Sequence, residues 1–268
     1  MSDSRPIGVF DSGVGGLTVA RAVLDLLPNE SLIYVGDSAH FPYGPRPVEE
    51  IRGFAMEIAA CLVQRDVKLL VVACNSIEVS AIGDIATAHG IPVVGVINPG
   101  ARAAIRATRN GVVGVIGTSA TILTGAYARA VGSAVELHAV ACPAFVEHVE
   151  RGDTTSEELR MAARRYLAPL KEDGIDTLIL GCTHYPLLSG LLQLELGPDV
   201  VLVSSAEETA KDVYAELLRA GGLREGPAPH HEFLTTGDAE PFREHAELFL
   251  GRELAHVKAV HIEAGGRS

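Results

Sequence analysis

The sequence predicts an α/β protein made of two similar parallel-sheet domains, which are related by a pseudo-twofold axis and share an active site in the cleft between them. Short, almost purely apolar runs alternate with segments of helical period, a pattern typical of parallel strands covered by helices on both faces. With 268 residues, the chain is long enough for two domains. Its two halves also resemble each other in sequence, which indicates a duplicated α/β unit.

The apolar runs define the expected strands, which are rich in β-branched residues. In chain order these strands are Ile7–Phe10, Leu32–Gly36, Leu69–Ala73, Val93–Val96, Val113–Gly117, Leu137–Ala141, Thr177–Gly181 and Val200–Val203. Helical spacing is clearest at Val48–Arg65 and Ser156–Glu172. The tail predicts a helix at Ala206–Arg219, a strand near Glu232–Thr236 and a further helix, and we expect it to pack on the first domain.

The internal repeat is visible in the letters themselves, because IGVFDSGVGGLTVARAV resembles VGVIGTSATILTGAYARAV. Aligning Gly8 with Gly114 gives an offset of 106 residues, and the strand before Cys74 meets the strand before Cys182 at an offset of 108. Four strands recur in the same order with nearly constant spacing. One matched pair of apolar strands could arise by chance, but four in register are much less likely to. We therefore predict a first domain at 1–98 plus 207–268 and a second at 99–206.

Composition narrows the class of function. The net charge is −12 at pH 7 and no cluster of Lys and Arg is present, so nucleic acid is not an expected partner. The sequence has neither a signal-peptide pattern at its start nor an apolar run near the ~20 residues that span a bilayer. We expect a cytoplasmic protein with a small-molecule substrate and no membrane partner. A homodimer is possible.

Neither a metal nor an organic cofactor is expected. The cysteines form no CxxC pair and the histidines lack ligand spacing, so no metal site is predicted. The lysines (Lys68, Lys171, Lys211 and Lys258) lie in helix-like or polar surroundings rather than at strand ends. No lysine is therefore a candidate for holding pyridoxal phosphate.

Cys74 and Cys182 stand apart from the other two cysteines. Each ends an apolar strand and is followed by small polar residues, and ligands of parallel α/β sheets bind at that edge. Cys61, inside a helical pattern, and Cys142, before Pro143, are interpreted as buried apolar residues. If the two domains face each other, Cys74 and Cys182 face each other too. Two opposed thiols can remove a proton from one face of a carbon and return one to the other face, which is racemisation.

The glycine-rich segment DSGVGGLTV follows the first strand, and it begins with Asp11 and Ser12. Its glycines do not have the spacing of a dinucleotide or phosphate loop. We favour a tight turn that presents backbone N–H groups to a small carboxylate, with Asp11 as a polar or acid–base group; a purely structural turn is the alternative. In the second half, Thr118 and Thr121 offer hydroxyls at the equivalent place.

Three further segments carry polar candidates. In GDSAHFPYG, the backbone and phenol of Tyr43 and the neighbouring Gly44 could reach the cleft, whereas Asp37 is either a loop brace or a substrate contact. The charged residues of FVEHVERG, at 145–152, are on sequence alone a solvated helix face. His184 follows Cys182 by two residues, and it either assists that thiol or is a hydrogen-bonded bystander.

These motifs together resemble the glutamate racemase family of the aspartate/glutamate racemase superfamily. The resemblance runs from Ile7 to Phe249 and rests on FDSGVGGLTV, GDSAHFPYG, ACNS and GCTHYPLL, with SSAEETA in support. It implies interconversion of L- and D-glutamate without a cofactor, to supply D-glutamate for peptidoglycan. It also implies two α/β domains with the site between them, and Cys74 and Cys182 as the acid/base pair.

The resemblance further implies roles for residues that flank the cysteines. The implied substrate contacts are Asp11, Ser12, Tyr43, Gly44, Asn75, Ser76, Thr183 and His184. Support of proton transfer is implied for Asp11, Glu150 and His184.

The run ACNSIEVS departs from the family pattern, in which small residues follow ACN[TS]. Here Ile77 is bulkier and Glu78 adds a negative charge near a helix start, where the helix dipole favours it. We expect Glu78 to point away from the cleft, since it would otherwise repel a glutamate side chain. Two alternatives remain open: a racemase of aspartate or another amino acid, and a non-enzymatic protein that binds a small ligand in the same cleft.

Overall fold

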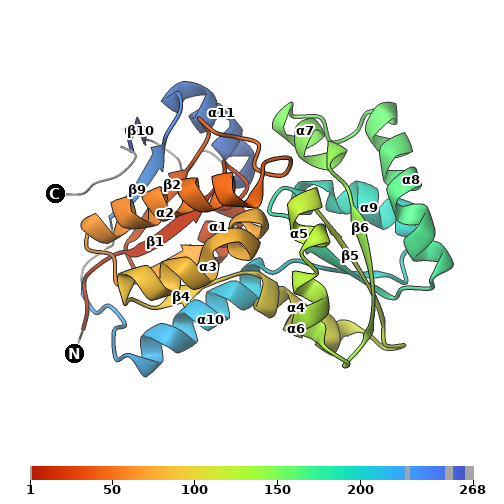
Figure 1. The fold of residues 1–268 in the computed structure, drawn as a ribbon, viewed down its shortest axis with the longest axis horizontal. Helices are drawn as coiled ribbons and strands as arrows, with labels where there is room; N and C mark the ends of the chain where they lie inside the picture. The colour runs from red at the N-terminus through yellow and green to blue at the C-terminus, as the bar shows by residue number, and fades with distance from the viewer. Residues whose placement is uncertain (1, 227–229, 251–255, 263–268) are drawn as a thin grey trace.

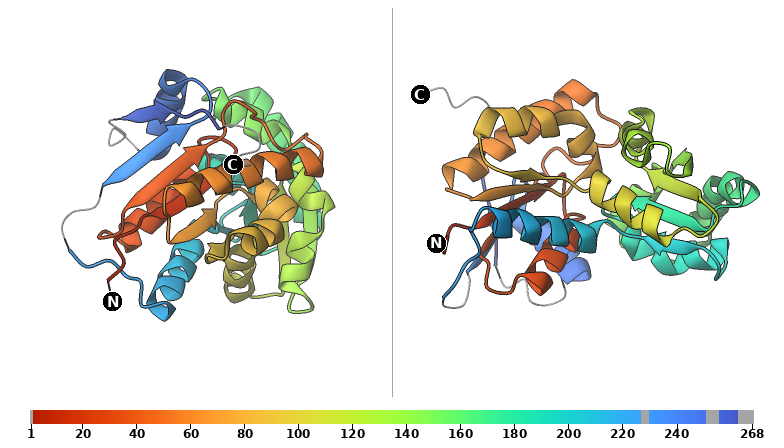
Figure 2. Two further views of the ribbon diagram at one scale, coloured as in Figure 1. Left: turned by 60° about the vertical axis from the view of Figure 1, so that its left-hand side comes forward. Right: turned by 90° about the horizontal axis from the view of Figure 1, so that it is seen from below.

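The protein is described by a computed structural model over residues 2–226, 230–250 and 256–262. It contains two all-parallel β-sheets with helices packed on their faces (Figure 1). A view from below shows the two sheet layers side by side, with the helix at Ala206–Arg219 (α10) running along the first (Figure 2). This architecture confirms the predicted class of two parallel-sheet α/β domains.

The first sheet has the strand order β10-β9-β2-β1-β3-β4. Its strands are β1 (Ile7–Asp11), β2 (Leu32–Gly36), β3 (Leu69–Val72), β4 (Val93–Val94), β9 (His231–Thr235) and β10 (Val257–Ala259). Strand β1 lies at the centre, where Val9 is in register with Tyr34 on one side and Val71 on the other. The interior strands are wholly buried, which explains why their sequences are apolar on both faces.

The second sheet has the order β6-β5-β7-β8. Its strands are β5 (Val112–Gly117), β6 (Glu136–Ala141), β7 (Thr177–Gly181) and β8 (Val201–Val203). This order repeats β2-β1-β3-β4 of the first sheet strand for strand, as the internal repeat predicts. Strands β9 and β10 of the tail extend only the first sheet, so the tail packs there as expected. The domain boundaries at 98 and 207 remain a prediction.

Helices cover both faces of each sheet. Those between the strands of the first sheet are α1 (Leu17–Leu26), α2 (Val48–Gln64) and α3 (Asn75–His89). The linking and second-sheet helices are α4 (Ile97–Ala107), α5 (Ser119–Leu123), α6 (Ala126–Val131), α7 (Ala144–Glu150), α8 (Glu157–Glu172), η1 (Tyr185–Leu188) and α9 (Ser189–Leu196). In the tail, α10 packs against α1, and α11 (Ala239–Leu250) follows β9. Within the described residues, no helix has the length and apolarity needed to cross a membrane.

Two strand predictions differ from the structure for local reasons. Strand β4 stops at Val94 rather than Val96, because the Val96 N–H donates to the carboxylate of Glu78 and Val96 becomes the N-cap of α4. Strand β10 was not expected, since Val257–Ala259 is three residues long and only partly buried. A segment of three residues is too short to show the periodicity of apolar residues from which a strand is predicted.

Candidate active site

A cavity lies at the carboxyl ends of the strands, between the two sheets. Its volume is about 90 Å³; one water needs roughly 10–15 Å³ in the same measure, so the space suits a small molecule. Residues that follow β1, β2, β3, β5, β6 and β7 all contribute to its wall. They are Ser12, Phe41, Pro42, Tyr43, Gly44, Pro45, Cys74, Asn75, Ser76, Thr118, Ser119, Pro143, Val146, Glu147, Cys182, Thr183 and His184.

The structure brings most of the predicted residues to this wall. Both cysteines line the cavity, as do Ser12, Tyr43, Gly44, Asn75, Ser76, Thr118, Thr183 and His184. Asp11, Thr121 and Glu150 lie behind the wall. Cys142 is fully buried outside the cavity and Cys61 lies partly buried on α2, so neither is placed to act on a ligand there.

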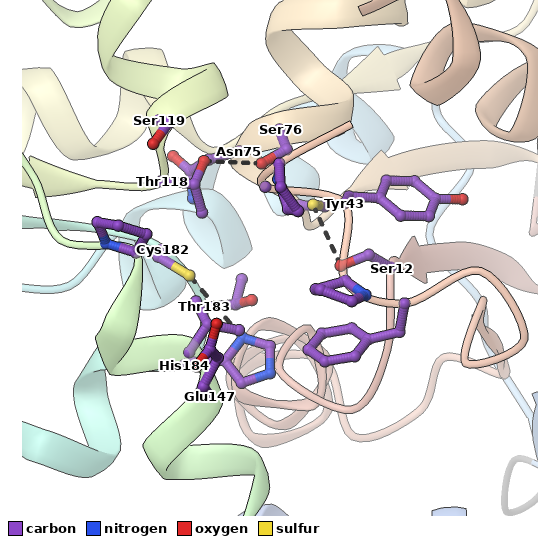
Figure 3. A pocket seen from close by; sticks show the side chains of 17 residues that line it. Ser12, Tyr43, Asn75, Ser76, Thr118, Ser119, Glu147, Cys182, Thr183 and His184 are labelled. Atoms are coloured by element: carbon purple, nitrogen blue, oxygen red, sulfur yellow. Dashed lines mark hydrogen bonds between the residues drawn. The ribbon is translucent and has the colours of Figure 1, made fainter. Parts of the chain in front are cut away.

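Cys182 begins a chain of polar contacts within the second domain. Its Sγ lies 3.8 Å from Nδ1 of His184 (Figure 3). Nε2 of the same ring lies 2.5 Å from a carboxylate oxygen of Glu150. Burial by itself lowers the pKa of His184, but the contacts with Cys182 and Glu150 outweigh it and raise the pKa to about 10. The ring therefore stays protonated at neutral pH and can exchange a proton with the sulfur.

Cys74 has different surroundings. It is the N-cap of α3, and its thiol donates to Oγ of Ser12 across 3.7 Å. Burial, followed by the nearby charge of Asp11, raises the pKa of Cys74 well above its usual range, although the Ile77 N–H and Ser12 act in the opposite direction. Cys74 is therefore held as a neutral thiol, the form that can donate a proton.

Asp11 is the last residue of β1 and is completely buried. Its Oδ2 accepts a hydrogen bond from the Gly16 N–H at the start of α1, 2.8 Å away. Its Oδ1 is buried with no hydrogen-bond partner among the described residues. A buried carboxylate oxygen without a donor is costly, which makes Asp11 a candidate acceptor for a ligand group. Contact between Asp11 and substrate stays a prediction.

Polar side chains at the start of α3 join the two domains. The hydroxyls of Ser76 and Thr118 lie 2.9 Å apart (Figure 3). Thr121 does not line the cavity, and contact between Thr121 and substrate stays a prediction. Its side chain is fully buried against Thr118, with the two hydroxyls 3.0 Å apart, because Thr118 is the N-cap that holds the Thr121 N–H in the first turn of α5.

Tyr43 lines the cavity, but its phenol does not reach into it. The ring points away from the cavity (Figure 3), and its hydroxyl donates a short hydrogen bond to the carboxylate of Asp37. Asp37 also accepts from His40 and Thr236. Asp37 is therefore a loop brace, and the Tyr43–Gly44 segment faces the cavity through its backbone.

Glu78 points away from the cavity, as expected. One carboxylate oxygen accepts from the N–H groups of Val96, at 2.5 Å, and Ile97, at 3.0 Å, at the start of α4. Burial raises the pKa of Glu78 to about 7 although these two donors lower it. Gly95 makes room for this carboxylate, because a Cβ there would lie 2.4 Å from Cδ of Glu78. Glu78 therefore does not repel a ligand in the cavity directly.

The first glycine-rich turn packs directly on the loop after β7. A Cβ on Gly15 would lie 2.5 Å from Oγ1 of Thr183 and 2.6 Å from Nδ1 of His184. Only glycine allows this approach. The turn thus brings the two domains together beside the cavity.

Sequence reasoning missed part of the wall. Phe41 and Pro45 belong to the loop after β2, and Ser119, Pro143, Val146 and Glu147 follow β5 and β6. The one signal in the sequence that could have found them is their position after a strand. Most of them are apolar or proline residues, whose side chains have no group that indicates chemistry. Glu147, interpreted as part of a solvated face, is exposed but borders the cavity.

The charge of the wall limits how an anion can bind. Among the described residues, none that lines the cavity is Lys or Arg. A carboxylate in the cavity can therefore be held by hydroxyls, the Asn75 amide, backbone N–H groups and the protonated His184 ring, helped by the N-terminus of α3. No three His, Cys, Asp or Glu side chains in the described ranges are grouped as metal ligands.

A family model described as Asp/Glu/Hydantoin racemase matches residues 15–226, which is most of the chain. The chain belongs to this family. Cys74 and Cys182, at the ends of equivalent strands, thus belong to a protein of a racemase family. The resemblance to this family that the sequence motifs indicated is confirmed.

Individual racemases are similar over nearly the whole length. The chain is 56% identical to a glutamate racemase of Parafrankia sp. (strain EAN1pec) over 94% of this chain and 93% of that protein. Among solved structures, a glutamate racemase isoform from Bacillus anthracis has a TM-score of 0.90 at 44% identity, covering 97% of both chains. A glutamate racemase from Francisella tularensis, in complex with D-glutamate, has a TM-score of 0.92 at 35% identity, covering 98% of this chain and 100% of that one.

Proposed function

We propose that this chain interconverts L- and D-glutamate without a cofactor, with Cys74 and Cys182 as the two acid/base residues. The observation that carries this proposal is the pairing of the two thiols on one small cavity, each following the equivalent strand of its own sheet. The similarity to proteins named glutamate racemase, over nearly the full length of both, supports glutamate as the substrate.

The proton transfers balance between the two sulfurs. In one direction, the thiolate of Cys182 removes the proton from Cα, and the thiol of Cys74 donates its proton to the opposite face of the carbanion. Cys182 then holds the proton taken from substrate, and Cys74 is the thiolate. In the other direction the roles exchange. The protonated ring of His184, held by Glu150, lies beside the Cys182 thiolate, and it can give its proton to that sulfur and take it back between turnovers.

Neutral donors would stabilise the charge that develops on substrate. Removing the Cα proton moves negative charge onto the α-carboxylate, and fixed dipoles aimed at that charge lower the barrier. Asn75 and Ser76 lie at the first turn of α3, whose dipole is positive at that end. We assign them, with Ser12, Thr118 and Thr183, to binding the carboxylates and ammonium group of glutamate.

The test is racemisation followed by circular dichroism with L-glutamate, D-glutamate and L-aspartate as separate substrates. We expect signal loss with both glutamate enantiomers and little with aspartate. Cys74→Ser and Cys182→Ser should each lower kcat by at least about 10³-fold, while Cys61→Ser, the same change outside the cavity, should retain normal activity. Full activity in either cavity variant would overturn the two-thiol mechanism, and faster turnover of aspartate would overturn the assigned substrate.

The cellular setting follows from the proposed reaction. D-glutamate supply for peptidoglycan, a cytoplasmic location and a homodimer remain predictions for this chain. A binding protein without activity is the remaining alternative, and it predicts that glutamate binds to the wild-type chain without loss of optical activity.

A further inference from the structure

A buried tyrosine from the second domain contacts the wall of the cavity from behind. Tyr127 lies on α6, and its side chain is 2% exposed. Its hydroxyl donates a hydrogen bond of 2.8 Å to Oδ1 of Asn75, the first residue of α3. Tyr127 itself does not line the cavity, whereas Asn75 does.

The other half of the Asn75 amide has no partner. Nδ2 is buried and makes no hydrogen bond within the described part of the chain. Because Oδ1 is turned to Tyr127, outside the cavity, the NH₂ group is the half of the amide left to face a ligand. A buried donor left unpaired in the free protein is costly, which points to a ligand acceptor at this place.

The direction of the hydrogen bond depends on the phenol keeping its proton. Burial raises the pKa of Tyr127 well above its usual range, and the charges of Glu78 and Cys182 add to this effect. The hydroxyl is therefore a permanent donor at working pH. An Asn amide can present either of its two ends to a neighbour, and in this structure the carbonyl end faces the phenol that donates to it.

We propose that Tyr127 is a positioning residue, which holds the Asn75 amide so that its NH₂ group faces a substrate carboxylate. This role rests on the proposed function, and it matters because the cavity wall has no Lys or Arg among the described residues. Each oriented neutral donor then carries a larger share of carboxylate binding. The hydrogen bond also spans the two domains, so the donor is correctly aimed only when the domains are together.

Neighbouring residues hold Tyr127 itself in place. A Cβ on Gly100 of α4 would lie 3.6 Å from the Tyr127 hydroxyl and 3.3 Å from Cβ of Ser205. The backbone of α4 therefore packs close against the phenol. Val19 occupies the corresponding place in the first half of the repeat, directly before the matching ARAV run, and a valine has no hydroxyl to offer. The positioning contact is thus a feature of one domain only.

The experiment is a double-mutant cycle between Tyr127→Phe and Asn75→Ala. Tyr127→Phe should raise KM for both glutamate enantiomers about tenfold, the effect expected of one oriented hydrogen bond, with a smaller change in kcat. In the Asn75→Ala background, the same Tyr127→Phe change should alter KM by less than about twofold, because no amide remains to be positioned. Calorimetric titration with D-glutamate should show the same pattern in Kd.

Tyr185→Phe is the matched control. Tyr185 is fully buried, and its hydroxyl donates to the carbonyl of Cys142 at 2.8 Å, so this change removes a comparable hydrogen bond from outside the cavity. We expect Tyr185→Phe to lower Tm but leave KM unchanged. The proposal is overturned by an unchanged KM and Kd in Tyr127→Phe, or by an equal loss in the presence and absence of Asn75. A wild-type chain that binds glutamate without racemising it would contradict the proposed function, while the Kd cycle would still decide the role of Tyr127.

Discussion

His184 links Cys182 to Glu150: its Nδ1 lies 3.8 Å from the sulfur, and its Nε2 lies 2.5 Å from the carboxylate. Across the cavity, Cys74 has only the hydroxyl of Ser12 as a side-chain partner within hydrogen-bond distance among the described residues. The two sulfurs occupy equivalent positions in the repeat but have unlike chemical surroundings. The predicted reaction is symmetric, whereas the groups that would perform it are not.

The first prediction concerns this asymmetry. In Cys74→Ser and Cys182→Ser, the remaining thiol can reach only one face of Cα, so each variant should exchange the Cα proton of one glutamate enantiomer with solvent deuterium far faster than that of the other. The preferred enantiomer should differ between the two variants. Proton NMR in D₂O measures both rates, and equal exchange of both enantiomers in either variant would contradict the mechanism.

The same asymmetry should appear in kcat and KM of the two directions, but not in their ratio. The two enantiomers have equal free energies in solution, so kcat/KM must be equal in the two directions for every variant. Differences between the cysteine variants can therefore appear only in kcat and KM taken separately. Progress curves started from each pure enantiomer provide these constants.

The second prediction concerns Glu150, which holds the His184 ring. Glu150→Gln removes the negative charge that helps to raise the pKa of His184 to about 10, so this pKa should fall and kcat should drop roughly 10- to 100-fold, less than for loss of a direct proton donor. NMR titration of the ring measures the pKa directly. Glu147→Gln is the control: Glu147 lies on the same helix but has no hydrogen bond or ion pair with His184 in the described structure, so the pKa of His184 should stay nearly unchanged.

Stability should change with the same pKa. A histidine whose pKa is raised on folding contributes stabilisation that is fully present below its ordinary value of 6.5 and is lost as pH rises through about 10. In Glu150→Gln this loss should be smaller and should be complete at lower pH, because the folded pKa of His184 lies closer to 6.5. Urea unfolding between pH 6 and pH 10 would reveal the shift, and identical profiles for the two proteins would count against the charge interaction.

The third prediction uses Glu78. Its folded pKa is raised to about 7 from 4.5, so its favourable contribution is present below about 4.5 and is lost as pH rises towards about 7, by up to about 3 kcal/mol. Glu78→Gln cannot ionise, so its free energy of unfolding should rise relative to that of the wild type between pH 5 and pH 8. The exposed Glu49→Gln is the control, and parallel pH profiles for wild type and Glu78→Gln would refute the shift.

The fourth prediction tests the close approach at Gly15. Gly15→Ala places a methyl group 2.5 Å from Oγ1 of Thr183, so the turn must move away from the loop after β7, and we expect kcat/KM to fall at least about tenfold through displacement of His184. Gly53→Ala, where no atom lies within 4 Å, should raise stability by roughly 0.5–1 kcal/mol because Ala is the better helix residue. Normal activity in Gly15→Ala would show that the contact is not needed.

Much of the fold was predictable because local patterns determine it. Apolar runs of four or five residues located the strands of both sheets except those of the tail, and the repeat between the halves predicted that β5 corresponds to β1 and β7 to β3. The end of β4 was misjudged because the Val96 N–H bonds to Glu78, a residue on the preceding helix. A strand's end depends on which partner takes each backbone group, and that partner is not adjacent in the sequence.

The sequence by itself determined which residues stand at the strand ends: Cys74, Cys182 and His184 follow buried strands, and parallel strands place their carboxyl ends at one edge. The tertiary structure alone decided where side chains point from there. It turned the Tyr43 phenol away to Asp37 and brought Tyr127, which resembles an ordinary core residue, behind Asn75. The physical reason is that position along a strand follows from short-range periodicity, whereas the orientation of a buried polar group depends on hydrogen-bond partners that only folding brings near.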